Sequence, residues 1–511
     1  MFKLRLLRLA GALLTVSAVS ACAVNPVTGN RELTLVTEAQ EIQLGQQNYA
    51  PMQQSQGGEF DVDPELTRYV NDIGQRLAAV SDRPLPYEFV VLNNSVPNAW
   101  ALPGGKIASN RGLLTEMGSE AELAAVLGHE IVHSAARHSA QRMERGMLLQ
   151  GLMLGAAVAT SDNSYQNLIL GGASIGAQLI TQAYSRGAEL EADKYGMRYM
   201  SAAGYDPQGA VSLQETFVRL SEGRQQDWLS GLFASHPPSQ QRVEENTRIA
   251  GNLPAGGDVG VDRYQAMLRR TRELLPAYEA YDEGRKALAE RDHQRAVNLA
   301  EKAIGLFPGE AHFYALRGDA RYMSKRYDMA ITNYTSAINR RDDFFYYHLQ
   351  RGLAQSQLGN DDAAVNDLER SLAFLETGPA HYTLGTIAER RGQTDRALAH
   401  YEKAGTGGGQ VANAAQASFA RLDLPRNPAK YVSRRCDRGN NGNLIVSVRN
   451  DTNLTLSGIT IAVALSGGRG VQRRLNRSLA AGQIASLDTG LGPYVAGTAC
   501  PATVSTARIG R

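Results

Sequence analysis

This sequence has a small net charge, few cysteines and no long apolar run. Its 53 basic and 51 acidic residues leave a formal net charge of only +2 over 511 residues. This balance gives no electrostatic footprint for nucleic acid, so we expect no nucleic-acid partner. The apolar run from Leu9 to Val19 is too short and wrongly flanked for a permanent transmembrane helix. The length predicts two or three domains, because one core rarely grows this large.

The N-terminus has the features of an export signal. Basic residues precede the apolar run, which predicts a secretory signal over residues 1–21. The signal ends in Val19-Ser20-Ala21-Cys22, similar to a bacterial lipobox, in which cleavage leaves a lipidated cysteine at the N-terminus. Because Ala23 follows Cys22, the resemblance favours anchoring to the outer membrane on its periplasmic side, with residues 22–30 as a lipidated tether. The alternative is ordinary cleavage after Ala21.

Only three cysteines occur in the chain. If Cys22 is lipidated, Cys436 and Cys500 remain as a pair in one C-terminal segment of an exported chain, where disulfides can form. We therefore predict a Cys436–Cys500 disulfide. Two free, buried thiols are the alternative.

Two histidines four residues apart give the strongest chemical signal. His129 and His133 lie in an apolar stretch, and on a helix both imidazoles leave the same face. Two neutral imidazoles at that spacing can bind one tetrahedral zinc ion. Glu130 then lies beside the open coordination position, where a general base can take a proton from zinc-bound water. The alternative is a surface helix that carries two histidines by chance.

A later acidic pair offers the third zinc ligand. Glu189 and Asp193 are again four apart, so one carboxylate can reach the metal while the other holds a ligand imidazole N–H. For Glu189 the alternative is a solvated helix face. With the apolar flanks and the export signal, the pattern predicts a zinc peptidase that needs no serine or cysteine nucleophile.

Two further residues near this pattern have less certain roles. His138 lies five residues after His133, about 140° further round a helix, so we expect it to point away from the metal as a surface or second-layer residue. Arg242 either stabilises a developing oxyanion or a substrate carboxylate, or pairs with Glu244 or Glu245; the second interpretation is favoured.

The flanking residues predict a mainly helical domain, over residues 31–255, with a small sheet. Helices are expected from Thr37, over 64–80 and over 119–145, and strands over 87–92, 98–102 and 106–109. The last two strands flank a glycine turn, and an edge strand there could accept an extended peptide. Trp100 belongs either to the core or to the substrate wall. Residues 146–179 are expected to form a helical hairpin over the site; the alternative is a surface that dips into lipid.

A repeat follows the Gly-rich boundary at residues 251–262. Gly284, Gly318, Gly352 and Gly385 are 34, 34 and 33 residues apart, the tetratricopeptide period. We therefore predict four repeats over residues 262–422, whose stacked helix pairs present a concave face to protein segments. Candidate contact residues on that face are Tyr314, Arg317, Arg321, Tyr322 and Tyr346; for the aromatic residues the alternative is core packing within a repeat.

The last segment, beyond residues 405–409, contains strand patterns in place of the helical repeat. Strands are expected over 444–448, 459–465, 471–478 and 485–487. They predict a small antiparallel β-sandwich over residues 431–511, without chemistry of its own and with interaction as its default role.

Five motifs occur in the order found in one family of zinc peptidases. They are Glu38-Ala39-Gln40-Glu41-Ile42-Gln43-Leu44-Gly45, Asn98-Ala99-Trp100-Ala101-Leu102-Pro103-Gly104-Gly105, the His129 helix, Tyr184-Ser185-Arg186-Gly187-Ala188-Glu189-Leu190-Glu191-Ala192-Asp193 and Ser235-His236-Pro237-Pro238. In these motifs the chain resembles the periplasmic gluzincin peptidases related to HtpX and to the CAAX prenyl proteases. The resemblance implies that Glu189 is the carboxylate ligand and that Glu191 is one position off the needed face. It also implies that His236, on a loop, can occupy the vacant zinc position and silence the enzyme; a plain loop histidine is the alternative.

Together these patterns predict a mainly α protein with a gluzincin-type zinc protease domain, a tetratricopeptide solenoid and a C-terminal β-sandwich. The expected function is that of a zinc endopeptidase of the cell envelope, with one Zn²⁺ per chain, that cleaves unfolded or misassembled envelope proteins. The repeats would recruit substrates or the outer-membrane assembly machinery. The alternatives are a chaperone or assembly factor for outer-membrane proteins with a mostly latent protease site, and a zinc site that is only structural.

Overall fold

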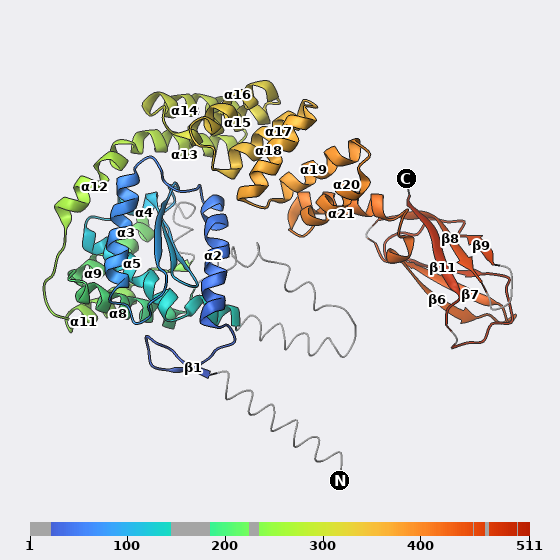
Figure 1. Cartoon of the computed structure of the whole chain (residues 1–511), viewed down its shortest axis with the longest axis horizontal. Coiled ribbons are helices and arrows are strands. Elements are labelled where there is room, and N and C mark those ends of the chain that lie inside the picture. The colour runs from blue at the N-terminus through green and yellow to red at the C-terminus, as the bar shows by residue number, and fades with distance from the viewer. Residues whose placement is uncertain are drawn as a thin grey trace, which may run out of the picture. The chain divides into compact units, whose positions relative to one another are not determined.

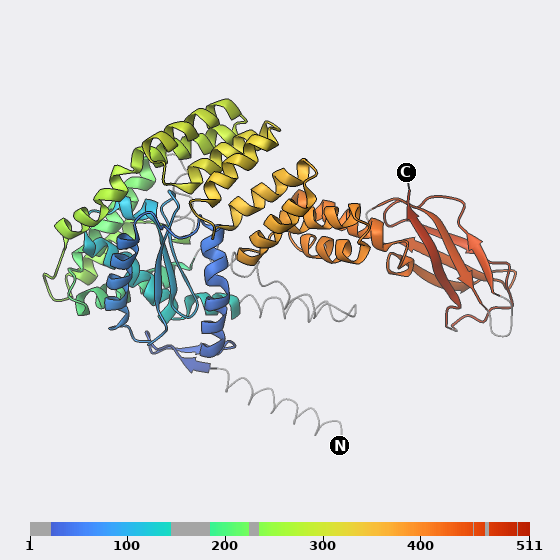
Figure 2. The same cartoon turned by 45° about the horizontal axis from the view of Figure 1, so that its top comes forward.

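The computed structural model describes residues 22–144, 184–223, 235–452, 454–464, 470–497 and 499–510. The predicted signal over residues 1–21 and the predicted hairpin over 146–179 lie outside the described residues. The chain divides into two compact units, residues 1–351 with 373–375, and residues 352–372 with 376–511. Each unit is described by itself, and Figures 1 and 2 show their elements. None of the described helices combines the length and the apolar character that crossing a membrane requires.

The first unit contains the peptidase-like part of the chain and the first repeats. Its strands are β1 (Cys22–Val24), β2 (Arg31–Leu33), β3 (Glu88–Leu92), β4 (Ala99–Leu102) and β5 (Lys106–Asn110). Its first helices are α2 (Glu38–Ser55), α3 (Pro64–Ala78), α4 (Arg111–Glu116), α5 (Glu120–Ala135), α8 (Arg186–Ala202), α9 (Gln208–Gly223) and α11 (Gln240–Ala250). They are followed by α12 (Val261–Glu273), α13 (Leu275–Ala289), α14 (His293–Leu306), α15 (Ala311–Met323), α16 (Tyr327–Ile338) and the start of α17 (Phe345–Gln357).

A three-stranded sheet in the order β3-β5-β4 lies beside the helices. β3 pairs with β5 in parallel and β4 pairs with β5 antiparallel, so the predicted hairpin is confirmed and β4 is an edge strand. Its turn uses Gly104 and Gly105, whose φ angles of 77° and 83° favour glycine. Trp100 of β4 is buried and meets Tyr49 of α2 edge to face at 6.1 Å, so it packs in the core.

Helix caps form where the sequence predicts them. Thr37 caps α2 in a capping box with Gln40, and Ser119 caps α5 by accepting from the backbone N–H of Glu122.

The segment predicted as a tether forms the hairpin β1–β2, in which Val27 between the strands is buried. Asn25 in the same loop donates to the backbone carbonyl of Ala136 at 3.0 Å. The start of the described chain therefore packs against the end of α5.

The predicted helix over residues 119–145 is wrong in one respect, because it is interrupted. α5 ends at Ala135, and Arg137 has a φ of 62° before helical residues resume at His138. Arg137 is held there by Glu41 of α2 and by the backbone carbonyl of Val36, to which it donates at 2.6 Å. Contacts from a distant helix thus fix a left-handed residue that local periodicity does not predict.

The predicted helix pairs of the solenoid are confirmed. The second unit continues with α18 (Asp361–Phe374), α19 (Gly378–Arg390), α20 (Thr394–Ala404) and α21 (Gly409–Asp423). At each repeat glycine a β-carbon would meet a neighbouring helix at 2.6–2.8 Å, which is the partner helix for Gly318, Gly352 and Gly385 and helix α15 of the next repeat for Gly284. The contacted side chains are Leu316, Tyr334, Leu368 and Tyr401. A larger residue at these glycines would push the paired helices apart.

The second unit ends in a β-sandwich after the short 3-10 helix η2 (Pro428–Lys430). Its strands are β6 (Val432–Arg438), β7 (Leu444–Asn450), β8 (Leu456–Val463), β9 (Val471–Arg474), β10 (Ile484–Asp488) and β11 (Ala502–Ile509). They form two antiparallel three-stranded sheets, β10-β7-β6 and β11-β8-β9. A disulfide joins Cys436 of β6 to Cys500, as predicted. The predicted strands are confirmed in place, whereas β6 and β11 were missed.

Candidate metal centre

The centre is built where α5 and α8 cross. A β-carbon on Gly196 of α8 would lie 2.9 Å from the backbone nitrogen of His129, and one on Gly128 would lie 3.0 Å from the carbonyl oxygen of Gly196. Two facing glycines therefore let the helix backbones touch. This close approach brings Glu189, two turns before Gly196, to the two histidines of α5.

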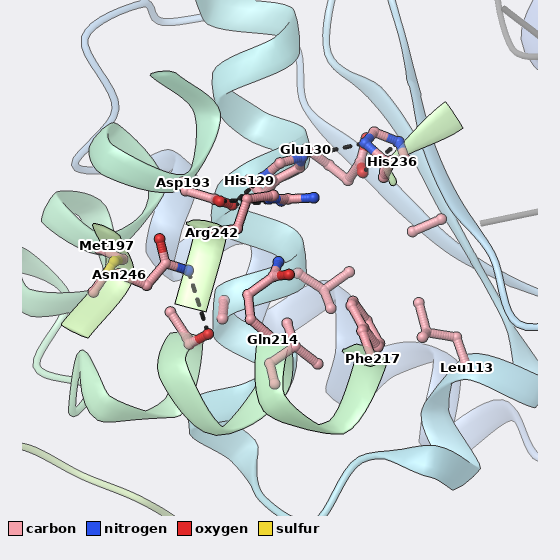
Figure 3. Close-up of a pocket in the computed structure, with 15 residues that line it drawn as sticks. Leu113, His129, Glu130, Asp193, Met197, Gln214, Phe217, His236, Arg242 and Asn246 are labelled. Carbon is pink, nitrogen blue, oxygen red and sulfur yellow. Dashed lines mark hydrogen bonds and ion pairs between the residues drawn. The ribbon is translucent and has the colours of Figure 1, made fainter. Parts of the chain in front are cut away.

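Four buried side chains meet at this crossing. One ligand atom from each of His129, His133, Glu189 and His236 lies within 4.8 Å of the other three. The Nε2 atoms of His129 and His133 are 3.0 Å apart, and the Glu189 carboxylate is 3.4 Å from His133 Nε2. Nδ1 of His236 is 3.3 Å from His129 Nε2 and 3.0 Å from Glu189 Oε1. Figure 3 shows the side of this cluster that carries His129, Glu130 and His236.

The other ring nitrogens of both α5 histidines already have partners. His129 Nδ1 is 2.9 Å from the carboxylate of Asp193, which only accepts, so the hydrogen is on Nδ1 and the lone pair is on Nε2. Nδ1 of His133 is 2.8 Å from Nδ1 of His138, whose Nε2 is 3.2 Å from Glu191. His138 therefore points away from the cluster, as predicted, but it is buried in the second layer and not on the surface.

Arg242 lies at the site, but its predicted partners are wrong. It donates to both oxygens of Asp193 at 2.7 Å and pairs with Glu189 at 3.0 Å, instead of with Glu244 or Glu245. The reason is that α11 turns this position inward, and a buried guanidinium needs buried carboxylates. Arg242 thus holds the two acidic residues of α8 together.

Burial and charge set the ionisation of the cluster in opposite directions. Burial raises the pKa of Glu130 and lowers that of His133 well below its usual value. Burial also opposes ionisation of Asp193 and Glu189, but Arg242 outweighs it for Asp193, and His236 and His129 outweigh it for Glu189, so both pKa values are lowered. The site therefore favours neutral imidazole at His133 and ionised carboxylates on α8.

The donor set fits a divalent metal. Two unprotonated imidazole nitrogens 3.0 Å apart, as at His129 and His133, repel each other unless a proton or a cation lies between them. Oε2 of Glu130 is buried without a hydrogen-bond partner, which is costly for an ionised oxygen. Two nitrogens, one carboxylate and an acid beside them match the ligands of a catalytic zinc site.

Tyr184 was missed by sequence reasoning as a part of the site. Its ring stacks on His133 with centroids 3.8 Å apart and an interplanar angle of 14°. Its hydroxyl is 2.9 Å from Ser139 Oγ, and burial raises its pKa to about 12, so it stays neutral. Its position before Ser185, the N-cap of α8, was the available signal, since the residue before an N-cap often packs near the fourth residue of the helix, which here is Glu189.

A pocket adjoins Glu130 (Figure 3). Its lining includes the apolar side chains of Ala99, Leu113, Val126, Met197, Leu213 and Phe217 and the polar side chains of Gln214 and Asn246. Such a pocket beside a general base can hold an apolar side chain of a bound peptide.

The histidine pair on one helix, the glutamate from a second helix and the acid beside them define the class of zinc metalloendopeptidases. Residues 64–250 match the model of Peptidase family M48, so this part of the chain is similar to that family.

Curated relatives agree with this assignment. The chain is 27% identical to the beta-barrel assembly-enhancing protease of Yersinia pestis over 66% of this chain and 75% of that protein. It is 24% identical to the protein of the same name from Escherichia coli strain K12, over 68% and 76%. It is 32% identical to the mitochondrial metalloendopeptidase OMA1 of Schizosaccharomyces pombe, over 43% of this chain and 64% of that one.

Proposed function

We propose that this zinc metalloendopeptidase cleaves unfolded or misassembled proteins of the cell envelope, with His129, His133 and Glu189 as the zinc ligands. The observation that carries the proposal is the convergence of these three buried side chains at the crossing of α5 and α8. A bound Zn²⁺ supplies a water whose pKa is lowered to about 7 and polarises a peptide carbonyl.

Within this proposal each neighbouring residue has one task. Glu130 is the general base that takes a proton and passes it to the departing amine. Asp193 fixes the tautomer of His129, and Arg242 keeps Asp193 ionised and pairs with Glu189. The β4 edge strand binds the substrate backbone by strand addition.

The setting is proposed from the sequence. Residues 1–21 are the signal, Cys22 carries the lipid that anchors the chain to the outer membrane, and residues 31–255 form the peptidase domain. The repeats over residues 262–422 recruit substrates or assembly machinery. Support comes from the lipobox-like segment and from the names of the two bacterial relatives, which refer to β-barrel assembly.

The substitution Glu130→Gln tests the peptidase proposal. It should leave one zinc per chain, because Glu130 is not a ligand, and should lower cleavage of a disordered peptide by about 10²–10⁴-fold. Metal analysis and a chelator-sensitive cleavage assay give the two readouts. Glu191→Gln is the matched control, since Glu191 contacts His138 and not the cluster. Normal turnover by Glu130→Gln would refute the assignment.

A second candidate function is that of a chaperone or assembly factor with a mostly latent protease. The observation that favours it is His236, which lies at the position of a fourth ligand. This function predicts that the Glu130→Gln variant still binds unfolded outer-membrane chains. Loss of that binding together with cleavage would favour the peptidase alone.

A further inference from the structure

The C-terminal β-sandwich differs from the rest of the chain in charge. Residues 431–511 contain ten arginines and three aspartates, with no lysine and no glutamate, which gives a net charge of +7. The remaining residues carry 43 basic and 48 acidic side chains, a net charge of −5. The net charge of the whole chain is therefore near zero although this sandwich is strongly basic.

One outer face of the sandwich lacks acidic groups altogether. None of the strands β8, β9 and β11 contains Asp or Glu. The buried residues Ile461 and Val463 of β8 face the other sheet, so Thr460 and Ala462 face outward. Across the strands Thr460 pairs with Thr506 and Arg474, and Ala462 pairs with Thr503 and Gln472. This outer face is a polar surface of hydroxyls and arginines.

Two exposed arginines converge on this face. A β-carbon on Gly458 would lie 3.7 Å from Nη2 of Arg474 and 4.0 Å from Cδ of Arg508. Gly458 has a φ of 61°, so the backbone itself turns here between the two side chains. Within the described part of the chain, neither guanidinium has an ion-pair or hydrogen-bond partner. Two guanidinium groups close together repel each other unless an anion lies between them.

The outer face of the other sheet is different, because its arginines are neutralised. Arg435 donates to Asp437 at 2.9 Å, and Arg449 pairs with Asp451 at 3.5 Å. Arg434 and Arg438 of the edge strand β6 are exposed and have no acidic partner among the described residues. The contrast therefore holds for the outward-facing arginines of the two sheets and not for every arginine of the sandwich.

We propose that the outer face of the β11-β8-β9 sheet docks on an anionic membrane, with Arg474 and Arg508 as ligands of its lipid phosphate groups. Guanidinium groups bind phosphate oxygens in a bidentate manner, which suits a surface that uses arginine and no lysine. The hydroxyls of Thr503 and Thr506 already donate to backbone carbonyls, whereas that of Thr460 on the same face can donate to a further phosphate oxygen.

A membrane surface fits this face better than a single dissolved phosphate. Arg474 and Arg508 are exposed on an open sheet, where one small anion would stay hydrated and bind weakly. Many phosphates in one plane engage several arginines together, and each basic residue near such a surface adds to binding. The proposed lipid at Cys22 would also place the chain beside a membrane; the docking surface does not depend on the peptidase proposal.

Vesicle flotation tests the proposal with the chain from residue 22 onward carrying Cys22→Ser, so that no lipid anchors it. Vesicles of equal amounts of phosphatidylglycerol and phosphatidylcholine are compared with pure phosphatidylcholine. The protein should float only with the anionic vesicles. Arg474→Gln with Arg508→Gln should weaken binding about 25-fold, about fivefold for each arginine. Arg435→Gln with Arg449→Gln removes the same charge from the other face and should weaken it much less.

Several results would overturn the docking surface. They are absence of binding to anionic vesicles, an equal loss in both double variants, and equal binding to dissolved polyglutamate. Displacement by inorganic phosphate, but not by sodium chloride of the same ionic strength, would point to a soluble phosphate site and refute the membrane. Peptide cleavage should be unchanged in both double variants, which separates a failure of this proposal from a failure of the peptidase.

Discussion

At the scale of single residues, the site depends on where each imidazole hydrogen is held. Asp193 fixes the hydrogen of His129 on Nδ1, and His138 contacts Nδ1 of His133, so both Nε2 atoms face Glu189. His236 adds a fourth possible donor to this cluster. If all four side chains bound one zinc ion, access for water and substrate would require His236 to move.

The substitution His236→Ala should increase cleavage of a disordered peptide several-fold while zinc stays at one per chain. The reason is that His129, His133 and Glu189 suffice as ligands, and removal of the fourth donor opens a position for water. Steady-state cleavage with metal analysis checks this. The double variant with Glu130→Gln should be silent, which shows that the added activity comes from the same site. Reduced cleavage by His236→Ala alone would instead make His236 a substrate contact.

The cluster residues could be predicted from the sequence because helical spacing is a local property. Two pairs of residues are spaced four apart, His129 with His133 and Glu189 with Asp193. A helix places the two members of such a pair on one face whatever surrounds it. The direction of His138 was predicted, but its contact with His133 could not be predicted in the same way. The geometry of α5 stops at Ala135, where contacts with α2 take over.

At the scale of elements, the crossing of α5 and α8 controls the distance between the ligands. Sequence reasoning missed Gly128 and Gly196, because a lone glycine in a helical pattern does not reveal which helix it faces.

The strands β6 and β11 were missed as well. β6 is an edge strand rich in exposed arginine, so the alternation that marks half-buried strands is absent from it.

The substitution Gly196→Ala should weaken zinc binding and cleavage by about 10–100-fold. Its β-carbon would lie 2.9 Å from the backbone of His129, so α8 must shift and carry Glu189 away. Zinc affinity and turnover are the measurements. Gly187→Ala in the same helix is the matched control, since its β-carbon would meet only Ser185 Oγ at 4.0 Å. Unchanged zinc affinity in Gly196→Ala would show that the crossing does not set the ligand distance.

In the repeats, Asp319 joins three helices and makes stability depend on pH. It accepts from the hydroxyls of Tyr334 at 2.8 Å and Tyr346 at 3.0 Å. Burial raises its pKa from 3.8 to about 7, although the two hydroxyls act to lower it. The folded chain therefore binds the proton more tightly than the unfolded chain. The contribution of Asp319 to the free energy of unfolding is complete below about pH 4 and is lost as the pH rises to about 7.

This predicts that the free energy of unfolding falls by up to about 1.4 kcal/mol per pH unit between pH 4 and 7 relative to Asp319→Asn. Denaturant unfolding of the two proteins at several pH values gives the difference. Asp328→Asn, at an exposed aspartate of the same repeat, should show no such trend. Parallel pH curves for wild type and Asp319→Asn would contradict the prediction.

At the scale of the whole molecule, catalysis and the basic sandwich belong to different compact units. The metal centre lies in the first unit, and the sandwich with its disulfide lies in the second. The order of peptidase, repeats and β-module could be predicted because each has its own period in the sequence, and the three periods differ. The separate charge of the sandwich was overlooked because the composition of the whole chain averages it away.

Replacing Cys436 and Cys500 with alanine should therefore destabilise the sandwich without changing peptide cleavage. The disulfide joins residues 64 apart in sequence, and loss of such a constraint on the unfolded chain costs about 2–4 kcal/mol. Both tryptophans, at positions 100 and 228, lie in the peptidase part of the sequence. Tryptophan fluorescence should thus report an unchanged transition, while circular dichroism reports a shifted one. Reducing the wild type should reproduce the variant. A parallel fall in cleavage would show that the two units do not fold independently.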